Sequence, residues 1–185
     1  MRSFLSLSSR CLLVCSLVVS PLDAVRGEPA AASLKSILLD QLRGTHDQEE
    51  WFVPVKIAID GLTPEQASWK DENENHSIAQ LVNHIVFWNQ QQLAKFRGEK
   101  PAPFSGDNKE TFSGVDKKSW ENSVKQIDEV LKAWEKAIEE ADEGKLAKWY
   151  STIARISTHN AYHTGQIIYI RKMRRNWDPE KGVKG

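Results

Sequence analysis

The sequence predicts an all-α protein, a four-helix bundle within a single domain. Apolar side chains recur at steps of three, four or seven residues over four long segments, which is the helical period. One connection, residues 98–115, is long and rich in proline and glycine, as expected for a crossover between helices. Residues 28–185 show no strict alternation of apolar and polar positions, so a half-buried strand is not expected.

The first helical segment covers residues 31–61 and should not be one straight helix. Gly44 and Pro54 lie inside it and are expected to bend or interrupt it. A one-turn helix is expected at Pro64, with Thr63 as its capping residue. The apolar residues of the segment and its continuation are Leu34, Ile37, Leu38, Leu42, Trp51, Phe52, Val55, Ile59 and Leu62.

Three further helices follow the polar residues 71–75. The second begins near Ser77 and ends at Gly98, and its apolar stripe is Ile78, Leu81, Val82, Ile85, Trp88, Leu93 and Phe96. The third begins at the capping residue Asp116 and is expected to stop before Gly144. The fourth is expected over residues 151–175.

Composition excludes several classes of protein. The chain has 185 residues, enough for one ordinary domain. Its 25 basic and 25 acidic residues give a formal net charge of zero, which argues against a nucleic-acid binder. We find no P-loop, no glycine-rich nucleotide fingerprint and no serine nucleophile elbow.

Residues 1–27 have the pattern of a secretory signal peptide. Arg2 and Arg10 flank a short polar region, an apolar run follows over residues 11–19, and Val25 and Gly27 are small residues before Glu28. The run is shorter than the roughly 20 residues of a membrane-spanning helix. We therefore expect residues 28–185 to be exported to the periplasm or secreted.

Two alternatives for this segment remain open at the level of sequence. A lipoprotein signal would use Cys15, although Val14 before it is larger than such a signal prefers. A mitochondrial transit peptide would be rich in arginine and serine but would lack a compact apolar block. Both cysteines lie in residues 1–27, so the expected mature chain has neither disulfides nor cysteine metal ligands.

Histidines interrupt the apolar stripes of the second and fourth helices. His159 and His163 lie four residues apart and share a helix face, which is a chelating spacing for a transition metal. His84 lies between Leu81 and Trp88 on the inward stripe of the second helix. Buried imidazoles must be hydrogen-bonded, protonated or bound to a metal, and three from two helices would leave a coordination position open.

The two remaining histidines have simpler interpretations. His76 precedes the start of the second helix and is interpreted as a residue of that helix start. His46 follows Gly44-Thr45 in a polar patch and is interpreted as part of a solvated face, with a spare ligand or a substrate contact as alternatives.

Three motifs in order along the chain carry a resemblance to a known family. They are Gly61–Gln66 followed by Trp69, the segment from His76 to Trp88, and the segment Thr158–Ile167 with His-x-x-x-His followed by x-Gly-Gln-Ile. The chain resembles the DinB-like superfamily over about residues 34–175. The resemblance implies a four-helix bundle in up-down-down-up order, with His84, His159 and His163 holding a divalent metal.

The resemblance also implies a range of activities. Members with known activity include thiol-dependent transferases and isomerases and some hydrolases. Low-molecular-weight thiols are cytosolic, so the expected export of this chain counts against thiol transfer. Asn160 stands where a His-Glu-x-x-His protease has its glutamate, which excludes that mechanism.

Two hypotheses of function follow. The first is an exported metal-dependent enzyme, a hydrolase or a thiol or group transferase, acting on a small molecule with zinc or nickel as the metal. The alternative is a non-catalytic bundle that binds a metal or a small ligand. An open coordination position favours the enzyme, whereas a fourth protein ligand such as His46 favours the binding module. A homodimer is compatible with either, and neither requires nucleic acid or a membrane span.

Overall fold

The computed structural model describes residues 32–73, 75–113 and 116–183. These residues belong to one unit of the chain, and the expected signal peptide, residues 1–27, lies outside them. The described residues form helices and no strand, which confirms the all-α prediction. The elements are α1 (Leu34–His46), α2 (Val55–Ile59), α3 (Pro64–Ser68), α4 (Ile78–Arg97), η1 (Asn108–Phe112), α5 (Lys117–Glu140), α6 (Glu143–Met173) and η2 (Pro179–Lys181).

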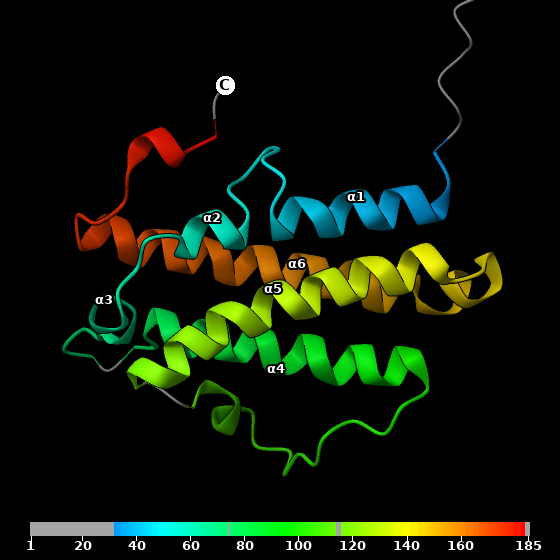
Figure 1. Ribbon diagram of the computed structural model, residues 1–185, viewed down its shortest axis with the longest axis horizontal. Coiled ribbons are helices and arrows are strands. Elements are labelled where there is room, and N and C mark those ends of the chain that lie inside the picture. The colour runs from blue at the N-terminus through cyan, green and yellow to red at the C-terminus, as the bar shows by residue number, and fades with distance from the viewer. Residues whose placement is uncertain (1–31, 74, 114–115, 184–185) are drawn as a thin grey trace, which may run out of the picture. The chain divides into compact units, whose positions relative to one another are not determined.

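The four long helices α1, α4, α5 and α6 form the bundle in the expected up-down-down-up order. In Figure 1, α1 and α6 run from right to left, whereas α4 and α5 run from left to right. Both α1 and α4 pack against α5 and α6. Because α4 and α5 point the same way, the connection between them must return along the whole bundle, and η1 lies on this return path.

Local sequence signals define most helix ends. The side chains of Ser33, Thr63, Ser77 and Asp116 each accept a hydrogen bond from the backbone amide three residues later, which satisfies amides that have no partner within the helix. Gly98 ends α4 with a φ of 78°, a left-handed conformation that glycine adopts without strain. The expected starts at Thr63, Ser77 and Asp116 and the expected end at Gly98 are confirmed.

The expected interruption of the segment 31–61 at Pro54 is confirmed, because the segment divides into α1 and α2 and Pro54 precedes α2. Gly44 lies within α1.

One expected boundary differs from the structure. The last helix begins at Glu143 rather than near residue 151, because Asp142 caps it by accepting a hydrogen bond from the Lys145 amide. Gly144 therefore lies within the first turn of α6 and does not separate the helices.

The core consists of the apolar stripes that the helical period predicts. All members of the α4 stripe are buried except Trp88, which is half-buried. Trp134 of α5 is fully buried, and its indole N–H donates to the Asn89 carbonyl at 3.2 Å. Within the described part of the chain, no helix is both long and apolar enough to span a membrane.

A buried pair of asparagines connects α4 to α6. Asn89 Nδ2 donates to Asn160 Oδ1 at 2.8 Å and to the Ile85 carbonyl at 2.8 Å, and both asparagines are fully buried. Since a buried amide is costly unless it is paired, this contact favours one register between the two helices. Asn160 is therefore a packing residue, in line with the exclusion of a protease glutamate at this position.

Replacing Asn160 tests this role. Asn160→Ala removes one of the two acceptors of the buried Asn89 Nδ2 and leaves only the Ile85 carbonyl, so we expect it to lower the free energy of unfolding by about 2 kcal/mol. Urea denaturation measures the change. Thr158→Ala, an exposed position on the same helix, should change it by less than about 0.5 kcal/mol. If Asn89→Ala and Asn160→Ala add without coupling in a double-mutant cycle, the pair does not act as described.

Candidate metal centre

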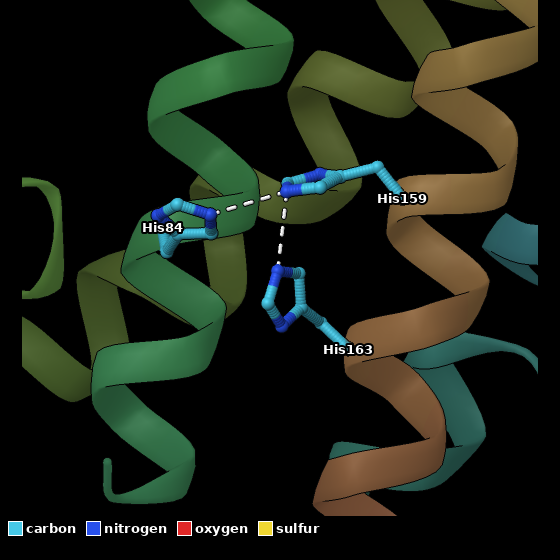
Figure 2. A group of neighbouring side chains, drawn as sticks. All are labelled: His84, His159 and His163. Atoms are coloured by element: carbon cyan, nitrogen blue, oxygen red, sulfur yellow. Dashed lines mark hydrogen bonds between the residues drawn. The ribbon is translucent and has the colours of Figure 1, made fainter. Parts of the chain in front are cut away.

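The bundle brings His84 of α4 together with His159 and His163 of α6. The Nε2 atom of His159 lies 3.1 Å from His84 Nε2 and 3.1 Å from His163 Nε2. Figure 2 shows the three rings pointing toward one another from the two helices. One ligand atom from each ring lies within 4.8 Å of the others, a group that could hold a metal ion. The sequence prediction placed these three residues together, and the structure does so.

The spacing of the three nitrogens suits a tetrahedral ion. Zinc–nitrogen bonds of 2.0–2.1 Å at tetrahedral angles separate two ligand nitrogens by roughly 3.3 Å. The two separations from His159 Nε2, both 3.1 Å, are close to this value. These two separations are therefore compatible with coordination through Nε2.

Thr111 of η1 determines the orientation and tautomer of His84. Its hydroxyl donates its single hydrogen to the Asn108 carbonyl at 2.7 Å. The same oxygen lies 2.5 Å from His84 Nδ1, so it accepts from Nδ1–H. A hydrogen on Nδ1 leaves a lone pair on Nε2, which is the nitrogen that faces the other two histidines. The Thr111 hydroxyl thus accepts from His84 as a carboxylate, a backbone carbonyl or a water commonly accepts from a metal-bound histidine.

Gln166 has the same effect on His163. Its side-chain oxygen lies 2.6 Å from His163 Nδ1 and can only accept, so Nδ1 carries the hydrogen and Nε2 the lone pair. Gln166 is the glutamine of the x-Gly-Gln-Ile part of the motif and lies three residues after His163 in α6. His159 differs, because its Nδ1 is buried and has no hydrogen-bond partner among the described residues.

Burial keeps the three imidazoles neutral. Burial, followed by the proximity of the neighbouring histidines with His163 first among them, lowers the pKa of His84 to about 3. Burial, followed by the proximity of His163, lowers the pKa of His159 to about 4. Burial also lowers the pKa of His163, while its hydrogen bond to Gln166 acts in the opposite direction. Neutral rings with free lone pairs are the form that binds metals.

The crossover covers His84 on its outer side. Phe112 of η1 stacks on His84 with ring centroids 4.0 Å apart, and its other face stacks on His76 at 3.8 Å. Gln80 donates to the Phe112 carbonyl at 3.0 Å and the Trp88 indole donates to Asn108 at 3.2 Å, so η1 is attached to α4 on both sides of His84. His76 does precede the α4 start as expected, but it also has this stacking role.

The two α6 histidines face cavities. A cavity of about 770 Å³ adjoins His163 and is lined by Trp69, Tyr162 and Tyr169 among others. A second cavity, of about 420 Å³, adjoins His159. Tyr162 and Trp88 line one cavity each, so they are pocket walls rather than buried core residues. If the three histidines held an ion, the cavities beside two of them would give a small molecule access to the neighbourhood of its fourth position.

The prediction for His46 is wrong. Instead of lying on a solvated face, its side chain is 1% exposed, with Nδ1 2.6 Å from Glu135 and Nε2 3.2 Å from Asp128. Both carboxylates come from α5, 82 and 89 residues further along the chain, which explains why the local polar sequence suggested solvent. His46 is outside the three-histidine group and does not supply it with a fourth ligand.

His46, Asp47 and Glu135 form a second group with ligand atoms close enough for a metal ion. Here, however, the carboxylates already have cationic partners. Arg43 Nε lies 3.6 Å from Glu135, and Lys56 Nζ lies 3.8 Å from Asp47. We interpret this group as an ion-pair network that joins α1 to α5.

The chain is thus an all-α bundle in which three histidines converge from two helices in a group that could hold a metal ion. The model of the DinB superfamily matches residues 55–167, more than half of the chain and a range that contains all three histidines. The chain belongs to the DinB superfamily, and the resemblance drawn from its motifs is confirmed. Neither the curated proteins nor the solved structures gave a match.

Sequence reasoning missed the contribution of η1. Thr111 and Phe112 lie in the long connection, which shows no helical period and was interpreted only as a crossover. Their contacts with His84 span 27 and 28 residues, so no local spacing indicates them. The one available signal is compositional, since an aromatic residue and a threonine stand together within an otherwise polar stretch.

Thr111 offers a test of the tautomer argument. Thr111→Val keeps the shape of the side chain but removes the acceptor for His84 Nδ1–H, and we expect zinc affinity to fall by about 10- to 100-fold. Thr111→Ser keeps the hydroxyl and should retain the affinity. Competition with a chromophoric chelator measures both. Equal affinity in the valine and serine variants would show that Thr111 does not orient His84.

Proposed function

We propose that this protein is a metal-dependent enzyme, a hydrolase or a group transferase that acts on a small molecule. The observation that carries the proposal is the convergence of three neutral imidazole nitrogens beside cavities large enough for a substrate. The proposed ligands are His84, His159 and His163. Imidazole ligands suit zinc or nickel, whereas calcium and magnesium prefer oxygen.

The residues of the chain have separate parts in this proposal. The three histidines would hold the ion through Nε2, and Thr111 and Gln166 would keep two of the rings in the required tautomer. When bound, a divalent ion supplies a Lewis acid that activates water or a thiol near neutral pH. The cavity walls would hold the substrate and restrict the access of water.

The competing hypothesis is a bundle that binds a metal or ligand without catalysis. It would be favoured by an occluded ion or by a fourth protein ligand. The cavities beside His159 and His163 argue against occlusion, and His46 lies in another cluster. We therefore favour the enzyme.

Metal content of a ligand variant tests the centre. His163→Ala removes one of three ligands, and we expect the purified, untagged protein to lose stoichiometric zinc or nickel, as measured by mass spectrometry of the metal. The stabilisation of the folded state by metal should disappear with it. Thr158→Ala serves as the control, because Thr158 is exposed on the same helix and lies outside the cluster and both cavities. Full metal content in the His163 variant would contradict the proposed centre.

Activity is tested with the same pair of variants. A screen of small ester, amide and thiol-transfer substrates with the metal-loaded protein should identify turnover that His163→Ala abolishes. Metal binding without turnover of any of these classes would support the non-catalytic alternative.

We also propose that the protein is exported. The support is the pattern of residues 1–27, with two arginines, a short apolar run and small residues before Glu28. Mass spectrometry of the native protein should show a chain that begins near Glu28. An intact chain recovered from the cytoplasm would contradict the proposal and would restore cytosolic thiols as candidate substrates.

A further inference from the structure

The smaller cavity, beside His159, lies between the two helices that carry the proposed ligands. Its walls are Trp88 and Gln92 of α4 and Thr152, Arg155, Ile156 and His159 of α6. Trp88 follows His84 by four residues, and Arg155 precedes His159 by four, so both belong to the helical turn next to a ligand. A molecule in this cavity is therefore adjacent to the candidate metal centre.

Arg155 is the one charged residue among the described residues that line this cavity. The larger cavity differs, because it contains both Lys70 and Asp71. Arg155 is exposed, and no carboxylate of the described residues forms an ion pair with it, whereas Arg43 pairs with two glutamates. A guanidinium that has no carboxylate partner can form two parallel hydrogen bonds to a carboxylate.

The distance between Arg155 and His159 limits the size of the ligand. Side chains four residues apart on a helix have Cβ atoms roughly 5–6 Å apart. A ligand that reaches both the metal and Arg155 thus needs a short spacer of a few atoms between its metal-binding group and its anionic end. Trp88 and Ile156 provide an apolar surface for that spacer.

We infer that Arg155 is the anion-recognition residue of this site, and that the substrate carries a carboxylate a few carbon atoms from the group that reaches the metal. This inference rests on the proposed function and specifies its substrate class. Three neutral imidazoles leave the full positive charge on a divalent ion, which also favours an anionic substrate.

Two hydroxamates of equal chain length test the inference on the zinc-loaded protein. Succinic acid monohydroxamate and butyrohydroxamic acid share the metal-binding hydroxamate, but the first ends in a carboxylate and the second in a methyl group. By isothermal titration calorimetry, we expect the carboxylate compound to bind roughly 10-fold more tightly, an effect moderated by the exposure of Arg155. Added salt should reduce this preference.

Variants that each remove one cation test which residue causes the preference for the carboxylate compound. Arg155→Gln should abolish the preference while leaving the affinity for butyrohydroxamic acid unchanged, which also shows that the variant is folded. Lys148→Gln removes an exposed cation of α6 outside the cavity, and Lys70→Gln removes the cation of the larger cavity. Both should retain the preference.

The outcomes separate this inference from the proposed function. Equal binding of the two compounds to the wild-type protein would overturn the anion site and leave the metal centre intact. Loss of the preference in Lys70→Gln rather than in Arg155→Gln would also overturn it, because the carboxylate would then lie in the larger cavity. Failure of both compounds to bind would overturn the open coordination position, and the proposed function with it.

Discussion

The meeting of three imidazole nitrogens between α4 and α6 is the constraint on which the arrangement of this protein depends. Thr111 and Gln166 place hydrogens on the Nδ1 atoms of His84 and His163, so their Nε2 lone pairs face His159 Nε2 at 3.1 Å. His159 has one hydrogen at most on that nitrogen and can donate it to only one of the two. A cation bound at this point, as proposed, would satisfy all three nitrogens at once and would offset the cost of burying such a polar cluster.

The topology of the bundle provides contacts that orient and cover this cluster. Because α4 and α5 are parallel, the chain must return along the bundle between them, and this return carries η1 across α4 (Figure 1). A short hairpin between antiparallel helices would have no residues in that place. The crossover thus provides Thr111 as the acceptor for His84 and Phe112 as its cover, while the Asn89–Asn160 pair favours the register that aligns His84 with the α6 histidines.

Those features that depend on local spacing could be predicted from the sequence. The helical period of the apolar residues predicted the bundle. The interruption of two apolar stripes by His84, His159 and His163 predicted the cluster, because a histidine on an inward face must be hydrogen-bonded, protonated or bound to a metal. The same reasoning gave a wrong prediction for His46. Its neighbours in sequence are polar, and its burial results from Asp128 and Glu135 on another helix. A cap such as Asp142 is local and could have been found, but the helical pattern near it was weak.

The three histidines have unequal surroundings. His84 is enclosed by the Thr111 hydroxyl and the Phe112 ring, and it does not line either of the two cavities described above. His159 and His163 each border a cavity, and the residues that line these cavities are largely distinct from those that orient the rings. Substitutions in η1 should therefore act on the metal, and substitutions at the cavity walls on the substrate. Gln166 is the exception, because it both orients His163 and lines the larger cavity, so that a ligand there is in contact with the hydrogen bond that holds a proposed metal ligand in place.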